Sequence, residues 1–125
     1  MPDYSSFYRY NISLAEVQKF EMIEPQLSAL RSEFNQLKAK KPEAPVSKAK
    51  IKMVNAVLGD ALELLERLPE AKYLAPLEED DIPQVSDVAM LLSQFQKAMA
   101  RFELLHKQGS RWFLNKVDAK KVGLE

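Results

Sequence analysis

The sequence predicts an all-α protein, an antiparallel three-helix bundle, and three observations support this prediction. Three long segments repeat apolar residues at alternating spacings of three and four, the pattern of an amphipathic helix. A residue that can cap a helix precedes each segment, and proline-containing connections separate them. A chain of 125 residues suits one domain and buries on the order of two-thirds of its unfolded surface. We therefore expect a single domain, residues 1–125, with its helices in up-down-up order.

The first helix is expected to begin at Ser13-Leu14-Ala15-Glu16, which has the form of a capping box. Its apolar stripe continues through most of the next 25 or so positions at ~100° per residue. The stripe consists of Phe20, Ile23, Leu27, Leu30, Phe34 and Leu37. Pro25 lies within it and removes one backbone hydrogen bond, so we expect either a kink or a second helix that starts at Pro25.

The second helix should follow a short extended turn that contains two prolines, with Ser47 as its N-cap. Its stripe consists of Ile51, Val54, Leu58, Ala61, Leu65 and Leu68. Four further apolar residues, Met53, Val57, Leu62 and Leu64, widen this surface to around half of the helix circumference at ~100° per residue. So wide an apolar surface requires two neighbours within the chain or a second subunit.

The third helix follows a long connection that holds the acidic run Glu78-Glu79-Asp80-Asp81 and, we expect, a short helix around residues 70–75. Ser86 can cap the third helix, and Gly109 is placed to end it in a left-handed conformation. Its stripe consists of Val88, Leu92, Phe95, Met99, Phe102 and His106.

Both ends of the chain are rich in aromatic residues, at positions 7–12 and 111–117. Aromatic and β-branched residues are favoured in strands, so these segments could pair as a small terminal β-ribbon. The alternatives are packing arms or a fourth short helix, and the all-α bundle is favoured over the α+β variant. We expect residues 1–12 to form an aromatic N-terminal arm and residues 118–125 to be a frayed tail.

Composition excludes several chemistries. The chain has no cysteine, one histidine and three glycines, so it offers no disulfide, no zinc-thiolate site and no glycine-rich phosphate loop. The acidic run lacks the alternating ligands, glycine and closing glutamate of a calcium loop. We expect no metal and no cofactor. No signal peptide is apparent, and the longest apolar run, Val88 to Leu92, is far short of the ~20 residues that span a bilayer. These features predict a cytoplasmic protein.

The segment Arg101-Phe-Glu-Leu-Leu-His106 resembles the Arg-x4-His motif of HEPN-domain ribonucleases, which are small, all-α and dimeric. The resemblance implies that Arg101 would stabilise a phosphate and that His106 would transfer a proton. Many members have a polar residue directly after the arginine, where this chain has Phe102. Residues five apart on a helix also point ~140° away from each other, so a buried histidine in an ordinary helix is the favoured interpretation.

A second alternative function is nucleic-acid binding by the lysines between positions 38 and 52, chiefly Lys41, Lys48 and Lys50. Trp112 lies beside further basic residues and could stack on an unpaired base. However, the 18 basic and 18 acidic side chains balance, so the chain lacks the overall positive charge typical of such proteins.

The favoured function is therefore one that needs no catalytic residues. We expect a small non-enzymatic protein that acts through protein–protein interaction or self-association, with a homodimer or another protein as its partner. The excess apolar surface of the second helix and an apolar residue on the polar side of the third suggest Val57, Leu64 and Leu104 as contact residues.

Overall fold

The computed structural model describes residues 12–123, and it confirms the predicted all-α bundle. Three long helices form the bundle: α2 (Leu14–Lys40), α3 (Lys48–Leu65) and α4 (Val85–His106). Shorter elements accompany them, namely the 3-10 helix η1 (Pro69–Tyr73), strands β1 (Lys107–Gln108) and β2 (Arg111–Trp112), and helix α5 (Lys116–Lys121). The short helix expected in the long connection is thus present as η1. Of the predicted N-terminal arm, only Ile12 lies within the described residues.

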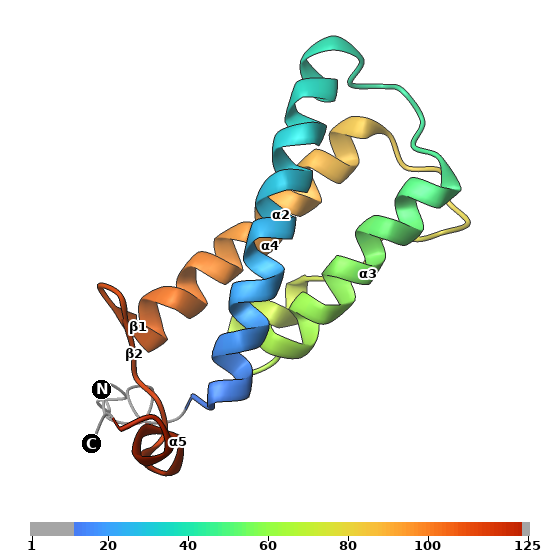
Figure 1. Cartoon of the computed structure of the whole chain (residues 1–125). Coiled ribbons are helices and arrows are strands. Elements are labelled where there is room, and N and C mark those ends of the chain that lie inside the picture. The colour runs from blue at the N-terminus through green and yellow to red at the C-terminus, as the bar shows by residue number, and fades with distance from the viewer. Residues whose placement is uncertain (1–11, 124–125) are drawn as a thin grey trace.

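The order of the helices differs from the predicted up-down-up arrangement. Residues near the start of α2 meet residues near the end of both other long helices, as Lys19 does with Glu63 and Phe20 with Phe102. Both α3 and α4 are therefore antiparallel to α2 and run in the same direction as each other, as Figure 1 shows. The up-down-up prediction is wrong because the connection between α3 and α4 is long enough to return along the whole bundle.

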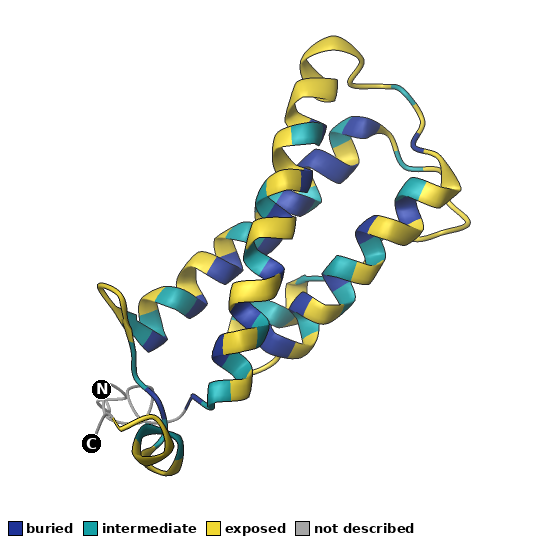
Figure 2. Ribbon diagram, viewed as in Figure 1, coloured by how far each residue is buried: buried dark blue, intermediate teal, exposed yellow. Residues whose placement is uncertain are grey.

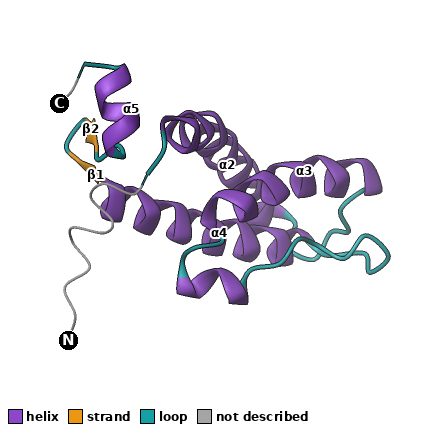
Figure 3. Cartoon of the chain, turned by 90° about the horizontal axis from the view of Figure 1, so that it is seen from below, coloured by secondary structure: helices purple, strands orange, loops and turns teal. Residues whose placement is uncertain are grey.

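The returning connection lies against α3 and α4 (Figures 1 and 3). Asn55 of α3 holds it by two hydrogen bonds, because its amide donates to the Leu77 carbonyl at 2.9 Å and its carbonyl accepts from the Leu77 amide at 2.8 Å. Leu74 and Leu77 are half-buried and pack against the core. The connection thus occupies the place that a fourth helix would take in a four-helix bundle.

The buried side of each long helix agrees with the predicted stripes (Figure 2). Every predicted stripe residue of α3 and α4 is buried, and in α2 only Leu37 is exposed. Of the residues expected to widen the surface of α3, Leu64 is buried, Val57 and Leu62 are half-buried, and Met53 is exposed. Most of the wide apolar surface of α3 is therefore buried within the chain, against α2 and the returning connection.

The predicted helix starts are confirmed for α2 and α3. The Ser13 hydroxyl accepts from the Glu16 amide, and the Glu16 carboxylate accepts from the Ser13 amide, both at 3.1 Å. The Ser47 hydroxyl accepts from the Lys50 amide at 3.2 Å. Helix α2 continues through Pro25, so no second helix starts there.

Helix α4 begins at Val85 rather than after Ser86, with Gln84 as its N-cap residue. The reason lies in the turn between α2 and α3, whose carbonyls at Pro42 and Ala44 accept from the amides of Ser86 and Val85, both at 2.9 Å. Backbone carbonyls of a neighbouring segment thus accept from the first two amides of α4, which have no partner within the helix.

The C-terminal residues close one end of the bundle. Gly109 has the predicted left-handed conformation, with φ of 62°, but α4 has already ended at His106. Gly109 is instead the first residue of the two-residue turn between β1 and β2. In a type II′ turn this position requires a positive φ. The predicted ribbon would have paired residues 7–12 with residues 111–117. Residues 7–11 lie outside the described part of the chain, and Ile12 forms an isolated parallel β-bridge with Leu114.

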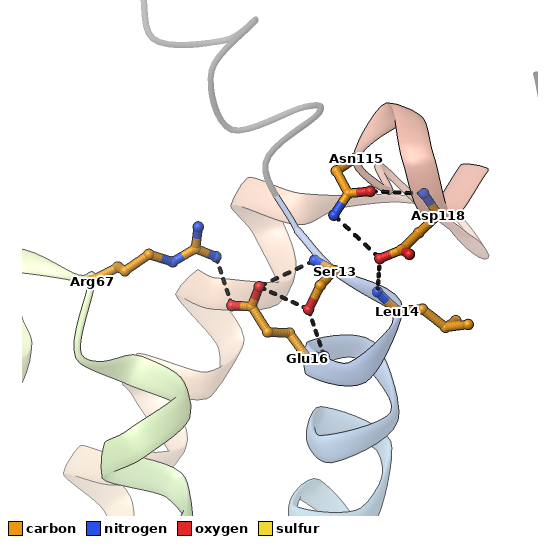
Figure 4. Close-up of polar contacts among 6 residues, drawn as sticks. All are labelled: Ser13, Leu14, Glu16, Arg67, Asn115 and Asp118. Carbon is orange, nitrogen blue, oxygen red and sulfur yellow. Dashed lines mark hydrogen bonds and ion pairs between the residues drawn. The ribbon is translucent and has the colours of Figure 1, made fainter. Parts of the chain in front are cut away.

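The described ends do meet, through α5 and the start of α2 (Figure 4). The Asn115 amide donates to the Ile12 carbonyl at 2.7 Å, and the Leu14 amide donates to the Asp118 carboxylate at 2.9 Å. Asn115 also caps α5 by accepting from the Asp118 amide at 2.8 Å. The prediction of a frayed tail is therefore wrong for residues 118–121.

We expect Asn55→Ala to lower the free energy of unfolding by about 2 kcal/mol, because it removes both hydrogen bonds to Leu77 and leaves partly buried backbone groups without partners. Urea denaturation followed by circular dichroism measures this change. The matched control is Asn35→Ala on an exposed site of α2, for which we expect a change within about 0.5 kcal/mol. Equal effects of the two substitutions would contradict the anchoring role of Asn55.

Candidate interaction surface

The three long helices meet along three seams, and each seam has a different chemistry. Ion pairs close the α2–α3 seam: Glu33 with Lys50, Lys19 with Glu63, and Glu16 with Arg67 at 2.9 Å. The hydrogen bond and positive charge of Lys19 lower the pKa of Glu63. The opposite charges along this seam balance, so it has little net charge with which to attract a charged ligand.

The α3–α4 seam is covered by the returning connection. Besides the Asn55 anchor, Glu70 of η1 lies against α4, where its Oε1 is 3.1 Å from Arg101 Nε. A pocket of about 380 Å³ remains between η1 and α4, lined by Glu70, Tyr73, Leu74, Gln94, Lys97, Ala98 and Arg101.

Helices α2 and α4 pack closely, and among residues 12–123 no ion pair joins them along the surface of their seam. It contains two adjoining pockets of about 580 and 560 Å³ that share Arg31 and Asn35, and we call them together the α2–α4 groove. Most of the lining side chains are serines, amides, small apolar residues or cations: Ser28, Arg31, Ser32, Asn35, Gln36, Lys38, Ala39, Ser86, Asp87, Ala89, Met90, Ser93, Gln94, Gln96 and Lys97.

Hydrogen bonds through the neutral amide of Gln96 join the two helices along this groove. Gln96 of α4 donates to the Ser28 hydroxyl at 2.7 Å and accepts from Arg31 at 2.8 Å. The Ser28 hydroxyl in turn donates to Glu24 at 3.0 Å. Arg31 is therefore held in place across the seam by a neutral amide rather than by a carboxylate.

The groove has a local excess of positive charge. Arg31, Lys38 and Lys97 are the cations of its lining, and Asp87 is the acid. The Asp87 carboxylate accepts from the Gln84 amide at 2.9 Å, at the start of α4. Serines, amides and cations in one groove are suited to bind a chain that presents carboxylates or backbone carbonyls.

The structure does not bring the predicted contact residues together on one surface. Leu64 is only 3% exposed and belongs to the core, so it presents no surface to a partner. Val57 is half-buried and packs against the same core. Leu104, by contrast, is 78% exposed on α4, and it is the one of the three that is available for contact.

Arg101 and His106 lie in different surroundings. Arg101 is on the surface of α4, paired with Glu70. His106 is 2% exposed and its ring centroid lies 4.7 Å from that of Phe102, inside the aromatic cluster at the end of the bundle. In this arrangement the imidazole is shielded from a phosphate bound at Arg101.

The lysines and the tryptophan suggested for nucleic-acid binding lie at opposite ends of the bundle. Lys41 and Lys48 are exposed beside the turn between α2 and α3, and Lys50 is paired with Glu33. Trp112 is at the other end, where its ring lies 5.0 Å from that of Phe20 and its indole nitrogen donates to Glu21 at 3.2 Å. The two groups therefore do not form one surface.

Sequence reasoning missed the α2–α4 groove. The available signal was a polar stripe on each helix at helical spacing, such as Ser28, Ser32 and Asn35 on α2. Such a stripe looks like an ordinary solvated helix face until the pairing of α2 with α4 is known.

Comparisons with family models, curated proteins and solved structures find no match to this chain. Among residues 12–123, no group of three or more histidine, cysteine, aspartate or glutamate side chains is arranged to hold a metal ion. Over the same residues, every helix is too short or too polar to cross a bilayer.

Proposed function

We propose that this protein acts without catalysis, as a helical interaction module that binds a protein chain in the α2–α4 groove. The supporting observation is the contrast between the seams. Ion pairs join the surfaces of α2 and α3, and the returning connection covers the α3–α4 seam. Among residues 12–123 no ion pair joins α2 to α4, and the two pockets of the groove lie over their seam. Specific interfaces combine an apolar contact with a polar, hydrogen-bonding rim, and the groove offers both through Met90 and its serines and amides.

A photo-crosslinking amino acid at Asn35 tests this proposal, because Asn35 is exposed and lines both pockets of the groove. In the protein's own host, we expect it to capture a protein chain that mass spectrometry identifies, either a second copy or one other protein. The matched control places the same amino acid at Ala56, an exposed site on α3, where we expect no such product.

Two results would contradict this function. One is the absence of any crosslink that is specific to Asn35. The other is crosslinking to nucleic acid instead of protein, which would favour an electrostatic role for the groove in binding a polynucleotide.

A further inference from the structure

We propose that the occupant of the α2–α4 groove is the acidic connection, residues 78–82, of a second copy of this chain. The inference rests on the proposed function and names its partner. All four carboxylates from Glu78 to Asp81 are exposed, and none of them forms an ion pair with another described residue. Ile82 follows them and is 64% exposed. The chain thus presents an acidic segment with an apolar residue at its end, and the fold gives that segment no partner among residues 12–123.

The groove has the complementary chemistry. Lys38 and Lys97 make no ion pair with another described residue, and Arg31 donates to the neutral Gln96. Met90, an exposed methionine in the lining, provides an apolar contact for an isoleucine. Carboxylates that meet such cations form charge-assisted hydrogen bonds, and opposite charge on two surfaces selects the partner and the register.

The acidic connection cannot fill the groove of its own chain. Asn55 holds one end of the segment at Leu77, and the Val46 amide holds the other end by donating to the Pro83 carbonyl at 3.0 Å. Both anchors belong to α3 or to the turn that precedes it, whereas the groove lies in the seam between α2 and α4 (Figure 3). A second copy is therefore needed to bring the two surfaces together.

The acidic connection bends at residues 79–81, so its carboxylates lie on a turn rather than along an extended strand. If each copy inserts its acidic connection into the groove of the other, the contact is two-fold symmetric and closes as a dimer.

Charge reversal on either surface provides the test. The groove variant carries Lys38→Glu and Lys97→Glu, and the connection variant carries Glu79→Lys and Asp80→Lys. These side chains are exposed and make no ion pair with another described residue, so we expect both variants to keep the circular dichroism spectrum of the wild type. Sedimentation equilibrium measures their association.

We expect the wild type to dimerise, with a dissociation constant that rises with salt. Each variant alone should dimerise about 100-fold more weakly, because like charges then face each other at both contacts. An equal mixture of the two variants should form a heterodimer of near wild-type affinity, since both of its contacts again pair opposite charges. A control with Lys52→Glu, an exposed lysine of α3 outside the groove, should dimerise as the wild type does.

Three outcomes would overturn the inference: a wild type that stays monomeric at millimolar concentration, variants that dimerise as well as the wild type, or a mixture that remains monomeric. A monomer that still crosslinks another protein at Asn35 would retain the proposed function and remove only the second copy as its partner. Absence of both dimer and crosslink would remove the function as well.

Discussion

Leu64→Asp is expected to lower the free energy of unfolding by about 4 kcal/mol or more, because it places a carboxylate without a partner inside an apolar core. A domain of this size has a total stability of roughly 5–15 kcal/mol, so most of that stability would be lost. Urea denaturation of the purified variant measures the change directly.

The matched control is Leu104→Asp, which makes the same substitution on the same residue type at the surface of α4. We expect its stability to stay within about 0.5 kcal/mol of the wild type. A Leu64→Asp protein as stable as the wild type would show that Leu64 is a surface contact, as the sequence alone suggested. The pair of variants therefore separates a core residue from an interface residue.

Phe102→Ala is expected to lower the free energy of unfolding by about 3–5 kcal/mol. Phe102 is buried at the centre of the aromatic cluster, with its ring centroid 5.7 Å from that of Phe20 and 6.5 Å from that of Trp112. Removing the ring leaves a cavity between α2, α4 and the β1–β2 hairpin. Trp112 is the single tryptophan of the chain, so its fluorescence reports on this cluster during denaturation.

A double-mutant cycle with Phe20→Ala should show a coupling of about 0.5–1.5 kcal/mol between the two stacked rings. Tyr73→Ala is the control, because Tyr73 is an aromatic residue that is 75% exposed on η1. We expect that control to change stability by no more than about 0.5 kcal/mol. Additive effects of the Phe20 and Phe102 substitutions would mean that the rings do not stabilise each other.

The apolar stripes and two of the helix starts could be predicted from the sequence, because both depend on local spacing. Phe20, Phe34 and Phe102 are buried as their periodicity predicts, and Ser13 and Ser47 cap the helices that follow them. Helix direction could not be predicted in this way, because the spacing of apolar residues is the same whichever way the helix runs in the bundle. The long connection after α3 allowed both directions, and only the tertiary contacts of Asn55 and of the 42–46 turn determine which one is formed.

The candidate site was harder to predict, because it depends on which helices pack against each other in the folded chain. Leu64 was assigned to an interface because α3 has more apolar surface than one neighbour can cover, but the returning connection supplies the second neighbour. The groove cations Arg31 and Lys97 are ordinary surface residues in the sequence. They form a surface only because α2 and α4 are paired by Gln96 and Ser28.

The contacts of Asn115 with Ile12 and of Asp118 with Leu14 have a consequence for how the chain is made. A ribosome synthesises a protein from its N-terminus, so the first turn of α2 leaves the exit tunnel long before Asp118 is added. The first turn of α2 therefore gains its hydrogen bond to Asp118 only after a further 104 residues have been added. Closing a loop of this length costs conformational entropy, and the contacts of the folded bundle offset that cost.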